Sequence, residues 1–277
     1  MKMIRAKKIT ETVSKLALEA NLVLRPDVLS ALKRFLGREA NKRAQDILRA
    51  VIANAAIAKR EKLAICQDTG MPVVFVELGQ GVKISGDLKG AINKGVASGY
   101  KKGYLRNSII ADPLRRGASG YTPAVIHVDI VRGNRFKLTV LPKGFGCENK
   151  SQLKMFKPTA EIAEIKQFIL EAVKAAGPDA CPPYIVGVGI GGSADYAALL
   201  AKKALLRKLN VKRATFYAKL EADLLREINN LHIGPMGLGG RTTALAVNIE
   251  IYPTHIAGLP VAVNISCHAL RSAGAVI

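Results

Sequence analysis

The sequence has no tryptophan and contains few aromatic residues of any kind. Of its 277 residues, seven are tyrosine and seven are phenylalanine. Proteins that bind single-stranded nucleic acid usually stack the bases on aromatic side chains that lie among basic ones. Because no such basic and aromatic alternation is present, the composition disfavours a single-stranded nucleic acid as the ligand.

Acidic residues are half as numerous as basic ones. The 21 aspartates and glutamates face 42 lysines and arginines, which gives a formal net charge of +21. A surface of this kind attracts anions, which include nucleic acid, anionic lipid, an acidic partner protein and small anionic substrates. The charge therefore bears on partners and substrates, and it carries no information about the fold.

Cysteines are also few, and no membrane-spanning run is present. The four cysteines lie far apart, and no apolar segment of signal-peptide type follows the basic start, so we predict a reducing cytoplasm and thiols without disulfides. One uncharged run covers residues 251–270, but its prolines and histidines make it too polar and too broken to cross a membrane. We interpret it as two buried strands joined by a loop.

Helix-like patterns dominate the first part of the chain. Thr10 is a candidate cap for a helix that ends near Leu22, and Pro26 opens a second helix that Gly37 closes. Apolar residues at helical spacing predict a third helix within residues 40–62. Later segments of the same kind predict helices over 87–105, 159–176, 193–209 and 214–231.

Segments rich in β-branched residues alternate with the later helices. The Gly- and Asn-containing stretch 132–135 separates two of them, and we predict that it joins them as a hairpin. The predicted strands cover residues 72–78, 122–131, 136–141, 184–190, 243–252 and 259–266. This order predicts an α/β or α+β fold, in which an N-terminal helical region (1–62) precedes a mixed β-sheet packed with helices, all within one domain of residues 1–277.

A glycine-rich run, Gly187–Gly192, formally fits the G-x-G-x-x-G pattern after a strand and before a helix. In dinucleotide-binding proteins such glycines let a pyrophosphate reach a helix N-terminus, and an acidic residue follows about 20 residues later. Here that stretch, 207–213, is basic. A tight strand-to-helix turn is therefore favoured over a nicotinamide site, which stays open as an alternative.

Taken one at a time, the candidate chemical residues are ambiguous. No C-x-x-C pair occurs, so each cysteine is either a small buried apolar residue or a metal ligand. Asp68 is either a proton donor or a turn residue, and His255 is either a substrate ligand or a hydrogen-bonded structural histidine. Arg106 is one cation among 42.

Five ordered segments between residue 60 and the C-terminus remove much of this ambiguity. Together they resemble the N-terminal half, or separate α subunit, of class I fumarate hydratases and of the related tartrate dehydratases. The resemblance implies a hydro-lyase that reversibly hydrates fumarate to malate, with L-tartrate or another hydroxy-dicarboxylate as the alternative substrate. The segments are 65–70, 143–151, 181–192, 233–245 and 255–269.

The resemblance implies a [4Fe–4S] cluster. The cysteines that match the cluster ligands of the family are Cys66, Cys181 and Cys267, which leaves Cys147 over. Three soft thiolates with one open iron would polarise the C–O bond of a poor leaving group by Lewis-acid catalysis.

The resemblance also implies a substrate site, with Asp68 as the acid for the departing water. A dicarboxylate requires an arginine fork and neutral donors, and a nearby carboxyl can exchange a proton. Glycines without a Cβ atom let the backbone approach a carboxylate closely. The residues implied around the substrate are Gln67, Asp68, Arg106 and His255, with the backbone at Gly144 and Gly146.

The chain departs from the family pattern at three places. Cys147 stands where serine is usual in fumarases, Met236 replaces a usual glutamine, and segment 117–121 differs from the common asparagine-rich version. Segments 148–151 and 255–268 nevertheless favour a fumarase over a tartrate dehydratase.

In the family, a second domain or a separate β subunit supplies the base and further substrate cations, and nothing in this sequence matches it. We therefore expect a β subunit of about 200 residues and an α2β2-type assembly, without a membrane or nucleic-acid partner. A non-enzymatic alternative is a basic protein that keeps the fold and binds nucleic acid or an acidic partner; a steep salt dependence of nucleic-acid binding would favour it.

Overall fold

The computed structural model describes residues 2–209 and 215–277. The chain forms two compact units, and neither unit is a continuous segment. Unit 1 contains Met1–Arg25, Asn54–Phe145 and Arg271–Ile277, whereas unit 2 contains Pro26–Ala53 and Gly146–Leu270. The helices expected within residues 1–62 are therefore divided between the units.

Unit 1 is built on a four-stranded mixed sheet with the order β12-β7-β2-β6. The central strand β2 runs parallel to β6 and antiparallel to β7. Its middle residues, Val73 to Val76, are all buried, which is typical of a strand with partners on both edges and cover on both faces. The strands are β2 (Met71–Gly79), β6 (Val125–Val131), β7 (Phe136–Lys143) and β12 (Ala273–Val276).

The predicted hairpin at residues 132–135 is wrong, because β2 lies between the two strands that it was expected to join. The connection instead runs across the end of β2 and bonds to the residues there. The amide of Gly79 donates to the carbonyl of Arg135 at 2.7 Å, and the amide of Gly81 donates to that of Gly133 at 3.0 Å. The chain does reverse direction at residues 132–135, as predicted, but β2 lies between the two strands that this connection joins.

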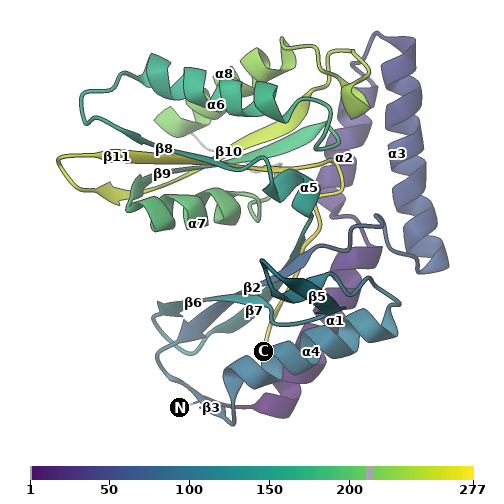
Figure 1. Ribbon diagram of the computed structural model, residues 1–277, viewed down its shortest axis with the longest axis vertical. Helices are drawn as coiled ribbons and strands as arrows, with labels where there is room; N and C mark the ends of the chain where they lie inside the picture. Colours follow the sequence, from purple (N-terminus) through teal and green to yellow (C-terminus); the bar gives the residue numbers. More distant parts are fainter. Residues whose placement is uncertain (1, 210–214) are drawn as a thin grey trace. The chain divides into compact units, whose positions relative to one another are not determined.

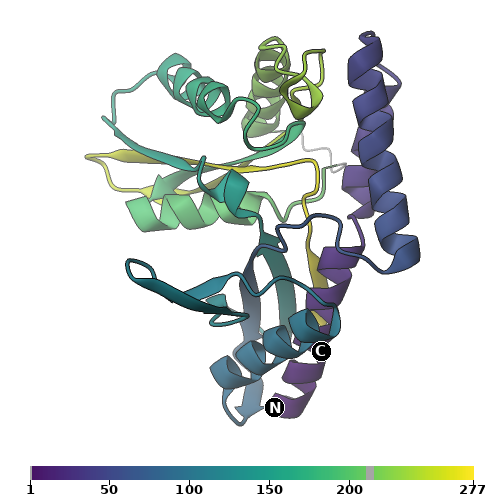
Figure 2. The ribbon, with the colours of Figure 1, turned by 45° about the vertical axis from the view of Figure 1, so that its right-hand side comes forward.

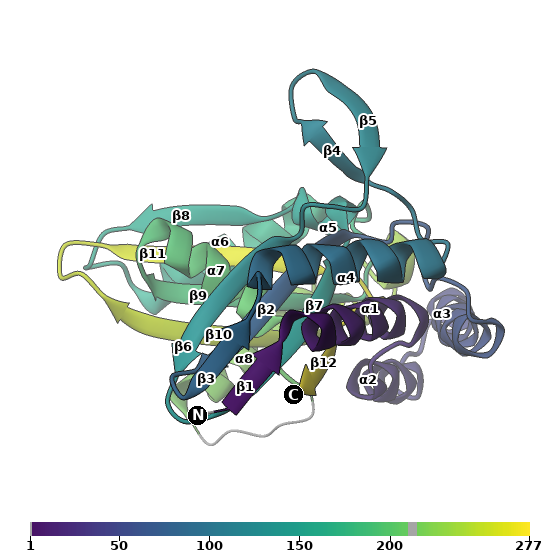
Figure 3. The same ribbon diagram turned by 90° about the horizontal axis from the view of Figure 1, so that it is seen from below.

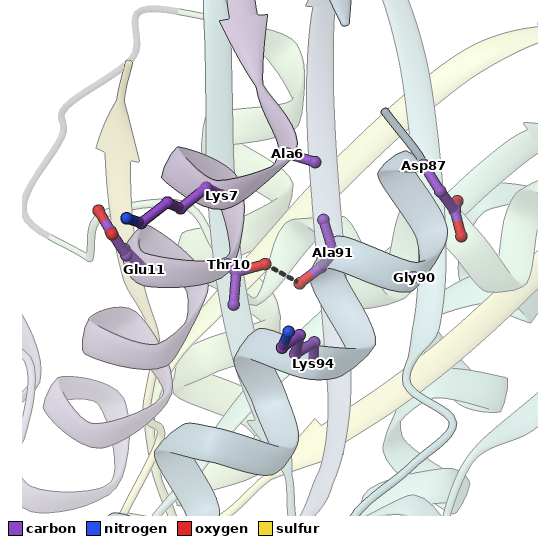
Figure 4. Close-up of a pocket in the computed structure, with 8 residues that line it drawn as sticks. All are labelled: Ala6, Lys7, Thr10, Glu11, Asp87, Gly90, Ala91 and Lys94. Atoms are coloured by element: carbon purple, nitrogen blue, oxygen red, sulfur yellow. Dashed lines mark hydrogen bonds between the residues drawn. The ribbon is translucent and has the colours of Figure 1, made fainter. Parts of the chain in front are cut away.

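Two helices, α1 (Ala6–Leu22) and α4 (Leu88–Lys102), pack together and against this sheet (Figure 3). The glycines of α4 make the close approach possible, since a Cβ atom on Gly99 would lie 2.6 Å from the carbonyl oxygen of Ser14. The prediction that Thr10 caps a helix is wrong, because α1 begins at Ala6. The Thr10 hydroxyl instead donates to the carbonyl of Ala91 at 3.0 Å and joins the two helices (Figure 4).

A two-stranded hairpin extends from the body of unit 1 (Figure 3). It consists of β4 (Ile109–Asp112) and β5 (Arg116–Gly120), which pair with each other in antiparallel fashion. A second small sheet pairs β1 (Lys2–Arg5) with β3 (Val82–Ser85) in parallel. These four short strands were not predicted from the sequence.

Unit 2 contains a second four-stranded mixed sheet, with the order β10-β9-β11-β8. Helix α7 covers one face of it, and α6 and α8 cover the other (Figure 1 and Figure 2). The main apolar core lies between the sheet and the α6–α8 pair. The elements are β8 (Gln152–Phe156), β9 (Tyr184–Gly192), β10 (Ala244–Thr254), β11 (Leu259–Ser266), α6 (Ile162–Ala176), α7 (Ala194–Ala204) and α8 (Phe216–Asn229).

The glycine-rich run lies in β9, where helix packing accounts for its first two glycines. A Cβ atom on Gly187 would lie 2.1 Å from the carbonyl oxygen of Ala201, and one on Gly189 would lie 2.0 Å from that of Ala197. The backbone of α7 therefore packs directly against β9 at these two glycines, and a side chain at either position would prevent this contact. This packing supports the interpretation of the run as a strand-to-helix element.

The remaining helices lie close to their predicted positions. Helix α2 spans Pro26–Leu36, and helix α3 spans Lys42–Glu61. A short helix α5, which was not predicted, spans Phe145–Glu148. A 3₁₀ turn covers Pro235–Gly237. Helix α7 ends five residues before the predicted 209, and the predicted start of the last helix, at 214, lies outside the described residues. No helix in the described parts of the chain is both long and apolar enough to span a membrane.

Candidate functional site

The segment before β2 holds Asp68 in a fixed position in unit 1. One carboxylate oxygen of Asp68 accepts the amide of Gly70 at 2.9 Å, and the other accepts the amide of Phe145 at 2.7 Å. The guanidinium of Arg271 donates to the Asp68 carbonyl at 2.7 Å. The predicted acid is therefore held both by its side chain and by its backbone.

The next residue, Thr69, ties this segment to the predicted substrate cation. The amide of Arg106 donates to the Thr69 hydroxyl at 3.1 Å, and that hydroxyl donates to the Arg106 carbonyl at 3.3 Å. The hydroxyl of the buried Tyr100 donates to the Thr69 carbonyl at 2.8 Å. Burial raises the pKa of Tyr100 to about 12, so this donor keeps its proton at any neutral pH. Thr69, which directly follows Asp68, thus links the Asp68 segment to the backbone of Arg106.

A cavity of about 580 Å³ in unit 1 brings these two residues to one surface. Its polar lining contains Asp68, Arg106, Ser108 and Arg116, and the rest of its wall is apolar. Arg106 is exposed and Asp68 is half-buried, so both are open to a ligand. A carboxyl group beside guanidinium groups in one cavity can bind an organic anion and exchange a proton with it.

A second cavity of unit 1, of about 590 Å³, lies between α1 and α4 and contains none of the predicted site residues (Figure 4). Lys7 and Lys94 line it together with Glu11 and Asp87. Two cations and two carboxylates on one wall leave no excess charge to attract an anion. The cavity that contains Asp68 is therefore the better candidate site.

The four cysteines differ in their surroundings. Cys66, Cys181 and Cys267 are partly exposed, whereas Cys147 is buried, with its thiol 3.3 Å from the carbonyl of Ala180. None of them forms a disulfide. Partly exposed soft thiols suit iron–sulfur ligation, and a buried thiol directed at a backbone carbonyl does not. The donor chemistry of the three predicted ligands therefore fits the cluster.

Two of the predicted ligands lie on neighbouring segments of unit 2. His268, which follows Cys267, has its Nδ1 atom 3.1 Å from the carbonyl oxygen of Cys181. Cys181 has a φ of +55°, a left-handed conformation that is uncommon for residues other than glycine. Cys66 belongs to unit 1. Over residues 2–209 and 215–277, no three His, Cys, Asp or Glu side chains gather in a way that would hold a metal ion.

The other predicted residues have different environments. Gln67 is exposed beside Cys66, and His255 is exposed in the connection between β10 and β11, where its Nδ1 accepts the amide of Ala257 at 3.1 Å. A Cβ atom on Gly144 would lie 3.4 Å from the Asp68 carboxylate, while one on Gly146 would meet nothing closer than 4.0 Å. Packing does not require either glycine, and their contact with a ligand stays a prediction.

Three residues that support or line this site do not stand out in the sequence. Arg271 and Tyr100 donate hydrogen bonds to the backbone of the Asp68 segment, and Arg116 lines the cavity. Arg271 is only 3% exposed. In the sequence, Arg271 is distinguished only by its position four residues after Cys267. Composition cannot separate a buried arginine from the 41 other lysines and arginines. Finding Tyr100 and Arg116 required the three-dimensional structure.

Comparisons with known proteins identify the family of the chain. The family model described as fumarate hydratase (Fumerase) matches residues 10–276. A protein of Methanocaldococcus jannaschii, named "Putative L(+)-tartrate dehydratase subunit alpha", is 40% identical over 274 residues, which cover 96% of each chain. Proteins named L(+)-tartrate dehydratase subunit alpha from Escherichia coli and Shigella boydii are 30% and 29% identical, over 95% of this chain and 89% of theirs.

The family match extends over nearly the whole described chain, through both units and through every predicted site residue. The mixed α/β architecture and the shared cavity of Asp68 and Arg106 are consistent with it. The chain therefore belongs to the class I fumarate hydratase family, a family of hydro-lyases.

Proposed function

We propose that this chain is the α subunit of a [4Fe–4S] hydro-lyase that adds water reversibly to a four-carbon unsaturated dicarboxylate, with fumarate and malate as the first candidates. The observation that carries the proposal is the cavity in which Asp68 and Arg106 meet, with the two residues joined through Thr69. The family membership supports the same type of reaction.

The chain's own residues account for binding and for one proton transfer. The Arg106 guanidinium pairs with a substrate carboxylate, and the Asp68 carboxyl gives its proton to the departing hydroxyl and takes it back in hydration. The amides of Gly70 and Phe145 fix the direction of the Asp68 oxygens, which limits the loss of orientation during the reaction. Gln67, His255 and the backbone at Gly144 and Gly146 complete the proposed substrate contacts.

Cys66, Cys181 and Cys267 would hold the cluster. When bound, it would supply a Lewis acid for the hydroxyl that leaves as water. Their partial exposure, compared with the burial of Cys147, supports this choice of ligands.

A partner supplies the remaining chemistry in this proposal. Removal of the carbon-bound proton requires a placed base, and no residue of this chain matches the base of the family. The relatives are named as α subunits, which supports a separate β subunit and an α2β2-type assembly.

L(+)-tartrate is the second candidate substrate. The relatives at 40% and 30% identity carry tartrate dehydratase names, and the chain departs from the fumarase pattern at Cys147, at Met236 and over 117–121. We rank fumarate first because segments 148–151 and 255–268 match the fumarase pattern.

The test is anaerobic reconstitution with iron and sulfide, with and without the β subunit, followed by assays on fumarate, malate and L(+)-tartrate. We expect turnover of fumarate and malate only when both subunits are present. Preferential turnover of tartrate would select the second candidate. Full turnover by the isolated chain would contradict the need for a partner, and inactivity of the complex on all three would contradict the proposed function.

A matched cysteine pair tests the ligand set. Cys181→Ser should abolish the visible absorbance of the cluster and the bound iron, whereas Cys147→Ser should retain both. The two variants carry the same chemical change, so equal iron loss in both would show that the ligands are wrongly assigned.

A further inference from the structure

We propose that Arg116 is a second carboxylate-binding residue of the cavity that contains Asp68 and Arg106, and that the β4–β5 hairpin selects dicarboxylates over monocarboxylates. This inference rests on the proposed function and extends it, because it assigns a specificity role to a residue of this chain that the family resemblance did not mark.

The hairpin places Arg116 at the wall of the cavity. Arg116 opens β5 and lies opposite Asp112, the last residue of β4. Arg106 lies on the segment that leads from α4 into β4. Both arginines therefore reach one cavity, one from the segment before the hairpin and the other from within it.

The two adjacent arginines of the hairpin have different surroundings. The Arg115 guanidinium pairs with Asp112 at 2.6 Å, and its side chain is 89% exposed. Within the described ranges 2–209 and 215–277, no ion pair involves Arg116 or Arg106, so neither charge is already matched by a carboxylate of the chain. Two such cations in one cavity attract an anion with two negative groups.

The backbone at Arg116 is held in an unusual conformation. Its φ is +66°, in the left-handed region that non-glycine residues rarely occupy. Asp112 stabilises the preceding turn, because its carboxylate accepts the amides of Leu114 at 3.0 Å and Arg115 at 2.9 Å. These backbone and guanidinium contacts from Arg115 lower the pKa of Asp112, so the turn keeps its charged acceptor at neutral pH. Strained residues that the surroundings hold in place are frequent at ligand-binding sites.

The rest of the wall suits a short carbon skeleton between two carboxylates. The apolar part is formed by Met71, Ile109, Ile110, Pro113 and Phe145. A monocarboxylate would satisfy one guanidinium and leave the other without a partner in this wall. A dicarboxylate can engage both, and the planar fork of each arginine fits a carboxylate in bidentate fashion.

The test uses the reconstituted holoenzyme with its partner and compares Arg116→Gln with Arg115→Gln. Arg116→Gln should raise the KM for the dicarboxylate and the inhibition constant of succinate by about 10- to 100-fold, since a charged hydrogen-bond pair is lost, and it should change kcat by less than about threefold. Inhibition by butyrate should change little. Arg116→Lys, which keeps the charge without the fork, should recover part of the loss.

The control, Arg115→Gln, should keep all of these constants within about twofold of the wild-type values. Both variants should retain the absorbance of the cluster. Equal behaviour of Arg116→Gln and Arg115→Gln would overturn the inference while leaving the proposed function intact. An equal loss of succinate and butyrate binding would overturn the dicarboxylate selection. A wild-type complex that turns over no dicarboxylate would overturn the proposed function, and this inference with it.

Discussion

Tyr100→Phe is the sharpest test of how the Asp68 segment is held. The substitution keeps the aromatic ring in the core of unit 1 and removes only the hydroxyl that donates to the Thr69 carbonyl at 2.8 Å and to the Gly70 carbonyl at 3.3 Å. Thr69 is 2% exposed, so water cannot replace the lost donor. We expect the variant to be less stable by about 1–3 kcal/mol at neutral pH, the cost of a buried acceptor left without its partner.

The same substitution should abolish part of the alkaline sensitivity of the fold. An unfolded tyrosine ionises near pH 10, while the buried Tyr100 keeps its proton to about 12. Between these values the native state holds more protons than the unfolded state, so stability falls as the pH rises. The full effect of this difference in pKa is about 3 kcal/mol, of which about half is lost by pH 11. The phenylalanine of the variant has no proton to lose, so this contribution should disappear.

Two measurements check this prediction. Guanidinium unfolding followed by far-UV circular dichroism, at about pH 9 and about pH 11, should show wild type losing about 1 kcal/mol more stability than Tyr100→Phe. Ultraviolet titration of tyrosinate should show that the variant lacks a group that titrates near 12. If the variant instead lacks a group that titrates near 10, or if the stability of the two proteins responds alike to pH, Tyr100 is not a buried donor to the Asp68 segment.

Two further predictions concern the same segment. Asp68→Asn should keep the cluster and its iron content but lower kcat by about 10²–10⁴-fold, because the proton donor is lost; unchanged turnover would remove that role from Asp68. Gly70→Ala should destabilise the chain by more than about 2 kcal/mol, because its φ is +76° and the new Cβ atom would lie 2.7 Å from the carbonyl carbon of Pro142. Gly133→Ala is the control, since its φ of +84° is similar but nothing lies within 4 Å, and equal losses in denaturation midpoint would contradict the steric explanation.

The sequence predicted the helices and the long strands well, because these carry their signals locally. Helices α2 and α6 have apolar residues at helical spacing, and α6 also begins with a capping box between Glu161 and Glu164. The error at residues 132–135 has a long-range cause, since the partner of both β6 and β7 is β2, from more than 45 residues earlier in the chain. Strand β5, of sequence RGASG, lacks the β-branched residues that reveal strands.

The site was predictable only in part, and for a different reason. Asp68 and Arg106 were assigned by resemblance, since neither residue stands out by spacing, and the structure brings both to one cavity. Arg271 is 203 residues from Asp68 in sequence, yet its guanidinium reaches the Asp68 carbonyl. A contact of this kind depends on the pairing of β12 with β7, and no local pattern in the sequence encodes it.

The pairing of the last strand with β7 also has a consequence for synthesis on the ribosome. Unit 1 draws its sheet from residues 71–143 and from 273–276, and all of unit 2 beyond residue 146 is translated between them. While the chain emerges, β7 is an uncovered sheet edge, and the Asp68 segment has no Arg271 beneath it. An uncovered edge can pair with other chains, and chaperones bind nascent proteins in this state. The sheet of unit 1 therefore gains its last strand, and the Asp68 segment its Arg271 contact, only after the whole of unit 2 has been translated.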